Sequence, residues 1–357
     1  MTRWEVHGAV CDRLAVAFLG HPANPPPVQP SWEALIAASS HQLVTPALAW
    51  ALRGTDCPPE VADYFETVLA LNRRRNAMLA DTLARVVAVL NRRGIEPVLL
   101  KGAAQLASGL YPAPGARLIG DIDLLVPTER GEEAAAALGA TGFAPAGPAP
   151  LVAVAMHHLP RLCERGTGDA VEVHTEVVGE RSAPFLPLPW FLAGTRSLPF
   201  RGLRLRVPDA TRAVAHAIVH DQVQDGGARY EPLRLRPLLD LALLRRDDAA
   251  IDWREVRALF DRNGAGDRLA AYLAGAAILF GQPAPREAGT APAGAVDRLR
   301  QALDDPEIAR RVRLAALLAA YRARLRAHPR VLLNLVSPRL WPQRIRMLAS
   351  VLRQSKG

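Results

Sequence analysis

The amino-acid sequence predicts an α+β protein in which a small mixed β-sheet core is flanked by helical N-terminal and C-terminal regions. Three observations predict this fold class. Apolar residues recur at helical spacing up to residue 94, short apolar or alternating runs bounded by glycine and proline follow up to residue 207, and helical spacing then returns. A chain of 357 residues has room for two or three domains. We expect them at residues 1–94, 95–207 and 208–357.

The first region reads as a series of helices. Trp4–Leu19 has apolar residues at helical spacing, and a proline-rich linker ends it. Ser31 is expected to cap the next helix, with Glu33 in its first turn. From about Glu60 to Arg93 apolar residues recur at steps of three and four, which predicts one long helix. Gly94 is expected to end this helix and pass the chain into a strand.

The expected core begins with an apolar strand at 96–100, which ends in Lys101-Gly102 and leads into a helix at 103–110. A glycine turn between a buried strand and a helix N-terminus is a typical site for anions. Lysine occurs only at Lys101 and Lys356, whereas arginine supplies the other 42 of the 44 basic residues. We interpret Lys101 as a position that needs a compact ammonium group rather than a planar guanidinium; chance is the alternative.

Two aspartates, Asp121 and Asp123, interrupt a second apolar strand expected at 120–126, after a proline- and glycine-rich loop at 112–115 that we expect to be mobile. Side chains at i and i+2 of a strand point to the same face. Two carboxylates on one buried face repel each other unless positive charge lies between them, and a divalent metal ion usually supplies it. A phosphate-binding turn beside such a site is what phosphoryl or nucleotidyl transfer requires.

A β-hairpin is expected next, with strands at 155–164 and 170–178 joined by the glycine-rich turn 165–169. Apolar and polar residues alternate in the second strand, so Glu172, His174 and Glu176 share a face. This face is either exposed to solvent or supplies a third carboxylate to the two aspartates.

The remaining chain is expected to be irregular at 182–199, to form a short strand at 201–207 and to be helical from residue 210 onward. The basic amphipathic segment Arg330–Gln354 is interpreted as a packed helix with a solvated face. Contact with a membrane or with RNA is the alternative for this segment.

The composition excludes several classes of protein. Half of the residues are hydrophobic and 22% are charged, which is a globular balance. Cys11, Cys57 and Cys163 are odd in number and lack CxxC spacing, so they support neither a disulfide framework nor a zinc site. The sequence shows no signal-peptide pattern and no apolar run of about 20 residues, so we expect a soluble, cytoplasmic protein. The net charge of +9 favours anionic partners such as nucleotides, nucleic acid or an acidic membrane surface.

The motifs together resemble the uncharacterised bacterial nucleotidyltransferases of the polymerase-β superfamily, in the branch with Leu-Lys-Gly followed by Arg-x-x-x-Asp-Ile-Asp-Leu. The resemblance covers about residues 35–285. It depends on these residues and motifs: Leu100-Lys101-Gly102, Tyr111, Arg117, Asp121-Ile122-Asp123-Leu124, Glu172-x-His174, His41, His216, His220, Arg236 and Asp240.

The resemblance implies roles for individual residues. Asp121 and Asp123 would hold two Mg²⁺ ions, with Mn²⁺ as the alternative metal. Glu172 would be the third carboxylate, sharing the catalytic metal and helping to deprotonate the acceptor hydroxyl. The other candidate binding residues, on the nucleotide side, are Lys101, Gly102, Arg117 and His174. Better-known members have serine or glycine after the turn glycine, whereas this chain has Ala103.

The leading hypothesis is therefore a nucleotidyltransferase of the EC 2.7.7 type that moves a nucleoside monophosphate, with AMP from ATP expected first, and releases pyrophosphate. The acceptor would be a hydroxyl or phosphate on a small molecule, a sugar or a peptide. The resemblance implies a place in natural-product, modified-peptide or exopolysaccharide biosynthesis. Nucleic acid is not expected as a partner, because no basic segment interleaved with aromatic residues occurs.

Two alternatives belong to other classes. One is a non-catalytic module of the same fold that binds a nucleotide or a peptide. The other is an HD-type metal phosphohydrolase centred on His216, His220 and Asp221, because the two histidines have the i, i+4 spacing of metal ligands. A further open point concerns Arg234, Arg236 and Asp240, which form an ion pair within the helical region or supply an arginine that closes over the nucleotide.

Overall fold

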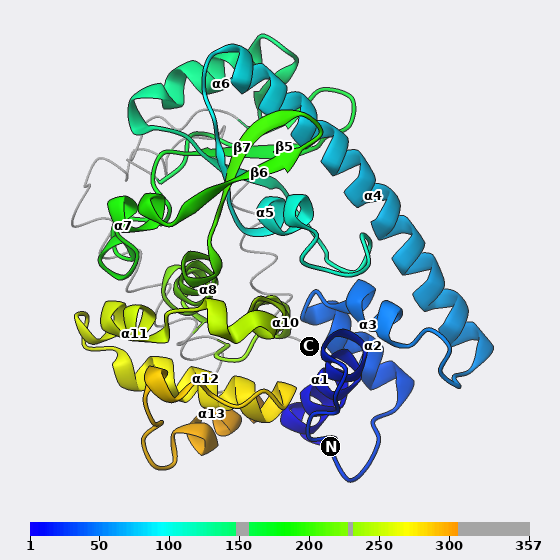
Figure 1. Cartoon of the computed structure of the whole chain (residues 1–357). Helices are drawn as coiled ribbons and strands as arrows, with labels where there is room; N and C mark the ends of the chain where they lie inside the picture. The colour runs from blue at the N-terminus through cyan, green and yellow to red at the C-terminus, as the bar shows by residue number, and fades with distance from the viewer. Residues whose placement is uncertain (148–156, 228–230, 306–357) are drawn as a thin grey trace, which may run out of the picture.

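The computed structural model describes residues 1–147, 157–227 and 231–305 and shows a sheet-based part above a layer of helices (Figure 1). The expected α+β class is confirmed, because the sheet contains parallel and antiparallel pairs and helices flank it in the chain on both sides. The expected segment Arg330–Gln354 lies outside the described residues. Among the residues described, no helix combines the length and the apolar character needed to cross a membrane.

The N-terminal region consists of four helices: α1 (Arg3–Leu19), α2 (Trp32–His41), α3 (Thr45–Ala51) and α4 (Pro59–Arg92). The predicted helix signals are confirmed in detail. The Ser31 hydroxyl accepts a hydrogen bond from the amide of Ala34 at the start of α2, which satisfies one of the unpaired amides there. Gly94 follows α4 with a positive φ of 72°, a conformation that favours glycine.

Helix α4 connects the two hydrophobic cores of the molecule. Its first half buries Val61, Phe65 and Leu69 against the other helices, whereas its second half buries residues such as Leu79 and Leu83 against the sheet. With about 1.5 Å of rise per residue, its 34 residues run along one side of the molecule from the N-terminal helices to the sheet (Figure 1). The helix therefore fixes the sheet relative to the helical layer.

The sheet has seven strands in the order β3-β4-β5-β2-β1-β7-β6. Their bounds are β1 (Val98–Leu99), β2 (Ile122–Leu125), β3 (Phe143–Pro145), β4 (Leu162–Glu164), β5 (Ala170–His174), β6 (Thr195–Phe200) and β7 (Leu203–Pro208). The expected hairpin appears as the antiparallel pair β4–β5, and β5 runs parallel to β2. Helices α5 (Lys101–Ser108) and α6 (Gly131–Gly139) cover the sheet together with the second half of α4.

Two strands were not expected from the sequence. The segment 182–199, expected to be irregular, contains α7 (Leu188–Ala193) and most of β6, and β3 lies in a stretch that reads only as a glycine- and proline-rich break. Strand β6 is at the edge of the sheet, where proline at position 199 is tolerated. A two-residue turn, Arg201-Gly202, with positive φ at both positions joins it to β7.

The C-terminal region follows β7 directly. Asp209 caps α8 (Ala210–Val219), which continues into the π-turn η3 (His220–Gln224). The later helices are α10 (Leu235–Leu244), α11 (Trp253–Asp261), α12 (Gly266–Phe280) and α13 (Ala295–Asp304). They share one hydrophobic core with α1, α2 and α3, so the two helical regions form a single layer below the sheet.

Candidate active site

The neighbouring strands β2 and β5 bring two carboxylates together. Asp123 on β2 lies opposite Glu172 in the parallel register, and His174 follows two residues later on the same face of β5. The Nε2 atom of His174 is 2.9 Å from Oδ1 of Asp123 and 3.7 Å from Oε2 of Glu172. Ligand atoms of Asp123, Glu172 and His174, the carboxylate–histidine cluster, all lie within 4.8 Å of one another. Such a group could hold a metal ion.

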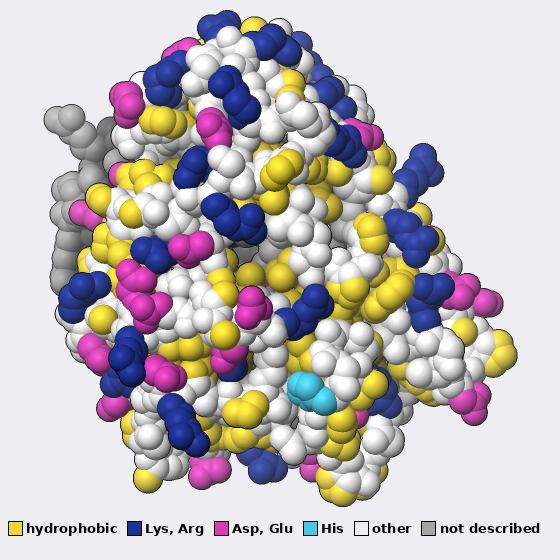
Figure 2. Space-filling model, in the orientation of Figure 1, with side chains coloured by type: hydrophobic (Ala, Val, Ile, Leu, Met, Phe, Trp, Pro, Cys, Tyr) yellow, Lys and Arg dark blue, Asp and Glu magenta, His cyan; other side chains and the backbone are white. Residues whose placement is uncertain are grey.

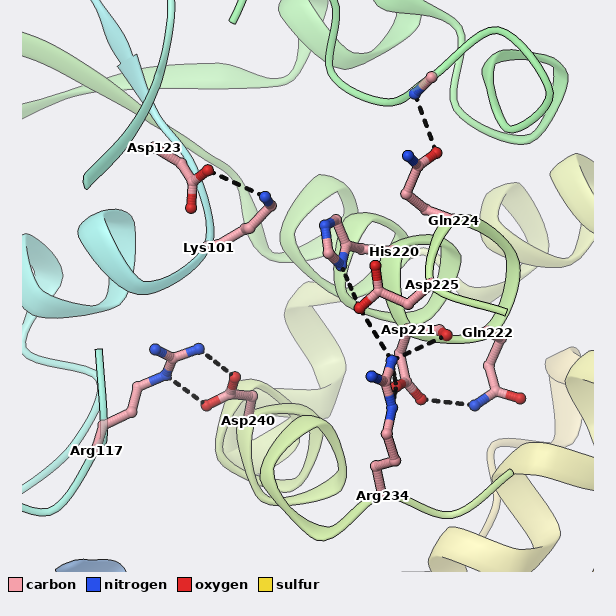
Figure 3. A network of polar contacts seen from close by, with 11 residues as sticks. Lys101, Arg117, Asp123, His220, Asp221, Gln222, Gln224, Asp225, Arg234 and Asp240 are labelled. Atoms are coloured by element: carbon pink, nitrogen blue, oxygen red, sulfur yellow. Dashed lines mark hydrogen bonds and ion pairs between the residues drawn. The ribbon is translucent and has the colours of Figure 1, made fainter. Parts of the chain in front are cut away.

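Lys101 reaches this cluster from the start of α5. Its Nζ atom is 3.0 Å from the same Oδ1 of Asp123 that contacts His174 (Figure 3). The backbone of Lys101 has a φ of +46°, and the amide of Leu100 donates to the carbonyl of Asp123, so the strand end and the helix start are fixed beside β2. The only lysine in the described residues thus contacts the more deeply buried carboxylate of the cluster.

The charges of the cluster are set by mutual contacts. Burial raises the pKa of Asp123, but the hydrogen bond with His174 and the charge of Lys101 outweigh it and hold this pKa well below the usual range. The neighbouring imidazole of His174 is also the main reason that the pKa of Glu172 is lowered. Burial lowers the pKa of His174, yet the two carboxylates raise it overall. Both carboxylates are therefore ionised at neutral pH.

Asp121, the other predicted member of the pair, lies just outside this close group. Asp121 precedes strand β2, which begins at Ile122. Its carboxylate is partly exposed and lies 3.5 Å from Nη2 of Arg161. Burial and the charges of Asp123 and Glu172 raise the pKa of Asp121, which shows that the three carboxylates influence one another. The structure therefore gathers Asp123, Glu172 and His174 and leaves Asp121 at the margin of the cluster.

Arg117 has a buried partner that the sequence did not reveal. Its Nε and Nη2 atoms donate to the two oxygens of Asp240 on α10 at 2.9 and 2.7 Å (Figure 3). The Tyr111 hydroxyl donates to the same carboxylate at 2.6 Å. A Cβ at Gly102 would lie 2.7 Å from Nη1 of Arg117. Gly102 thus leaves space for a guanidinium that connects the core to the C-terminal helices.

The loop before β2, for which the sequence predicts mobility, is hydrogen-bonded to α4. Asn72 donates to the carbonyls of Gly115 and Arg117 at 2.6 and 2.9 Å, and Asn76 donates to those of Pro114 and Arg117 at 2.7 and 2.9 Å. Both asparagines are buried on α4, where their amide groups replace the water that these carbonyls would otherwise bind. They fix the backbone from which Arg117 reaches Asp240.

Replacing Asp240 with asparagine is expected to lower the free energy of unfolding by about 3–5 kcal/mol, because it leaves the buried Arg117 guanidinium without a counter-charge. Denaturant titration of the purified variant measures this change. The control is Asp81→Asn, which breaks the exposed pair of Asp81 and Arg201 and is expected to cost about 1 kcal/mol or less. Equal losses of unfolding free energy in the two variants would show that the buried Arg117–Asp240 pair contributes no more to stability than an exposed ion pair.

Two histidines that the sequence analysis did not single out lie against the cluster. The rings of His157 and His158 each have their centroid 5.3 Å from that of His174, and His158 pairs with His174 through a β-bridge. Burial, followed by the charge of His174, lowers the pKa of His157 to about 4. The adjacent His-His pair before the hairpin was the available sequence signal.

The phosphohydrolase alternative is not supported by the geometry. The carboxylate of Asp221 accepts from Nε of Arg234 at 2.7 Å and from Gln222 at 2.6 Å, and His220 faces Asp225 at 3.5 Å (Figure 3). Within the part of the chain that the structure describes, the residues His216, His220 and Asp221 do not form a metal-binding group. Of the three residues whose role the sequence left open, Arg234 pairs with Asp221 and Asp225, and Asp240 pairs with Arg117.

A cavity of about 350 Å³ lies between α5, α8 and α10, next to the cluster. We call it the α5–α10 cavity. Its polar lining includes the basic or neutral side chains of Lys101, Gln105, Arg117, His216, His220 and Arg236 and the carboxylates of Asp209, Asp221, Asp225 and Asp240. Alanine, leucine, valine and proline side chains supply the apolar walls. A cavity of this size is within the range of small-molecule sites. Lys101 lines the cavity and also contacts Asp123, so the cavity adjoins the cluster.

The comparisons with known proteins give one match. A sequence model of a protein family described as uncharacterised nucleotidyltransferase matches residues 29–281. The matched segment contains the carboxylate–histidine cluster, Lys101, the Arg117–Asp240 pair and the residues that line the α5–α10 cavity. No curated protein and no solved structure matches the chain.

Proposed function

Because this chain belongs to the family of uncharacterised nucleotidyltransferases, we propose that it is a Mg²⁺-dependent enzyme that transfers a nucleoside monophosphate from a nucleoside triphosphate to an acceptor. ATP is the expected donor, and the acceptor is a small molecule, a sugar or a peptide that offers a hydroxyl or a phosphate. The observation that carries the proposal is the buried group of Asp123, Glu172 and His174 with Lys101 beside it, inside the matched segment.

The residues of the cluster fit a divalent metal ion. Two ionised carboxylates supply the oxygen ligands that Mg²⁺ prefers, and the imidazole nitrogen also suits Mn²⁺. The proposal assigns metal binding to Asp123 and Glu172, with Asp121 at the margin as a ligand of a second ion. A bound divalent ion would neutralise the phosphates of the nucleotide and polarise the phosphorus that is attacked.

The chain's own residues then have distinct tasks. Glu172, the less buried carboxylate, takes the proton of the acceptor hydroxyl. At the same time the oxygen of that hydroxyl forms a bond to the α-phosphorus. The bond from the α-phosphorus to the bridging oxygen breaks, pyrophosphate leaves with the electron pair, and Glu172 passes the proton to water. Lys101 balances the negative charge of Asp123 and of the phosphates. His174 orients the carboxylate of Asp123 through its hydrogen bond.

The distribution of surface charge agrees with a small anionic substrate. On the face shown in Figure 2, basic and acidic side chains are interspersed, and no continuous basic surface is visible there. A protein that binds nucleic acid usually gathers lysine and arginine on one face. The proposed partners are therefore nucleoside triphosphates and not nucleic acid. We also propose that the reaction is biosynthetic and takes place in the cytoplasm.

Thermal unfolding with each of the four nucleoside triphosphates tests the proposal. We expect one of them to raise the melting temperature in Mg²⁺ and to have no effect in EDTA, because ligand at 100 times its Kd stabilises the folded state by about 2.7 kcal/mol. Release of pyrophosphate from that nucleotide distinguishes an enzyme from the non-catalytic binding module, which would show the shift alone. If no triphosphate shifts the melting temperature in Mg²⁺, the nucleotide-binding proposal is wrong.

A further inference from the structure

Arg236 differs from the other arginines around the α5–α10 cavity. Arg117 is paired with Asp240 and Arg234 with Asp221 and Asp225, whereas Arg236 has no hydrogen bond or ion pair with another described residue. Arg236 is on the first turn of α10, is only half-exposed and lines the cavity. An arginine in such a position loses hydration without gaining a counter-charge, which is unfavourable unless a ligand supplies one.

Two other polar groups of the cavity lack partners. Nε2 of His216 and Oε1 of Gln105 are buried and make no hydrogen bond with any described residue. His216 is on α8 and Gln105 on α5, so the unpartnered groups come from both sides of the cavity. A buried donor or acceptor without a partner costs about 1–3 kcal/mol. Together with Arg236 they indicate a cavity built for a polar ligand.

The charges around Arg236 indicate the sign of that ligand. The charged groups that act on it most are Arg117, Asp240 and Arg234. Asp240 is already bound by both Nε and Nη2 of Arg117, and Arg234 is bound by two other carboxylates. Asp240 attracts Arg236 as well but is engaged by Arg117, and Arg236 forms no ion pair of its own with a described carboxylate, so the complementary ligand group is an anion.

The position of Arg236 separates this anion from the phosphates of the nucleotide. Lys101 lines the cavity from the start of α5 and contacts Asp123 of the cluster, whereas Arg236 lines it from the first turn of α10 and does not belong to the cluster. The cavity therefore reaches both the lysine beside the cluster and Arg236. All the charge of a nucleoside triphosphate is in its phosphates, which the proposed function assigns to the cluster.

We propose that the α5–α10 cavity is the acceptor site and that the acceptor is a small hydroxyl compound with a carboxylate or phosphate group that forms an ion pair with Arg236. The inference rests on the proposed nucleotidyl transfer. The reacting hydroxyl of the acceptor lies near Lys101, and the anionic group of the acceptor lies at Arg236. The carbon skeleton of the acceptor contacts the apolar walls. Arg236 thus selects the substrate, while the cluster performs the reaction.

Binding of inorganic phosphate and of acetate to the full chain tests this inference, with calorimetry as the readout and saturating Mg²⁺·ATP present or absent. We expect the wild type to bind at least one of the two anions, Arg236→Gln to bind it at least tenfold more weakly, and Arg236→Lys to retain part of the affinity. Arg262→Gln, at an exposed arginine outside the cavity, is the matched control and should bind like the wild type. The stronger probe identifies the acceptor as a phosphate or a carboxylate compound.

Affinity for Mg²⁺·ATP and stability complete the test. We expect Arg236→Gln to bind Mg²⁺·ATP within about twofold of the wild type and to unfold no more easily, because it removes an unpaired cation. Anion binding that is unchanged in Arg236→Gln, or that Mg²⁺·ATP displaces, overturns the acceptor site. A loss of stability as large as that of Asp240→Asn also overturns it, in favour of a structural role. A third outcome is that Arg236 binds the anion but no triphosphate binds in Mg²⁺. The anion site is then real, but the proposed nucleotidyl transfer is wrong, and so is the assignment of the site to an acceptor.

Discussion

Replacing Asp123 with asparagine is expected to lower nucleotidyl transfer by a factor of about 10³ or more, since the change removes the central negative charge of the cluster. The amide retains an oxygen that can accept from Lys101 and His174, so we expect the fold to persist with a loss of about 1–3 kcal/mol in stability. Release of pyrophosphate at saturating Mg²⁺ and nucleotide measures the activity, and circular dichroism verifies the fold.

Two further aspartates make this experiment more specific. Asp81→Asn, at an exposed position on α4, is the control and should leave turnover unchanged. Asp121→Asn is expected to abolish transfer as well, as the proposed two-ion site requires. Near-normal turnover of Asp123→Asn at low Mg²⁺ would show that the cluster is not the metal site, whereas the same result for Asp121→Asn alone would reduce the proposal to one ion.

Glu172→Gln is expected to separate binding from chemistry. The variant keeps the shape of the side chain but cannot accept the proton of the acceptor, and loss of a positioned base typically costs about 10²–10⁴-fold. Nucleotide binding through Asp123 should largely persist. The measurement pairs the affinity for Mg²⁺·nucleotide with the single-turnover rate.

Glu176→Gln is the matched control for this prediction. Glu176 shares the alternation pattern of Glu172 and His174, but β5 ends at His174, and Glu176 does not belong to the carboxylate–histidine cluster. Its replacement should change neither affinity nor rate. Unchanged turnover in Glu172→Gln would remove Glu172 from the mechanism and leave it as a charged neighbour of the buried His174.

Local sequence patterns predicted the elements whose formation depends mainly on neighbouring residues. Period-2 alternation placed Glu172 and His174 on one face, and helical periodicity with Gly94 predicted the long α4; both are confirmed. Strand β6 was missed because an edge strand tolerates proline and depends on pairing with β7. Its stability comes from a partner and not from its own composition.

The site shows the same division between local and distant causes. Strand β2 begins two residues later than expected, at Ile122, so that Asp121 precedes the strand and lies outside the close group; sequence patterns do not fix element ends so finely. The partners Arg117 and Asp240 are 123 positions apart, and the sequence had suggested partners for Asp240 only within the helical region. Asn72 and Asn76 read as ordinary polar positions on a helix until the loop they hold is seen.

The left-handed backbone of Lys101 has a consequence for the stability of this protein. An L-residue in that conformation costs about 1–2 kcal/mol relative to glycine. Replacing Lys101 with glycine would relax the backbone, but it would also leave the buried carboxylate of Asp123 without its ammonium partner, which is unfavourable. Backbone strain and charge placement at this position therefore act on stability in opposite directions, and the change in melting temperature of Lys101→Gly measures their difference.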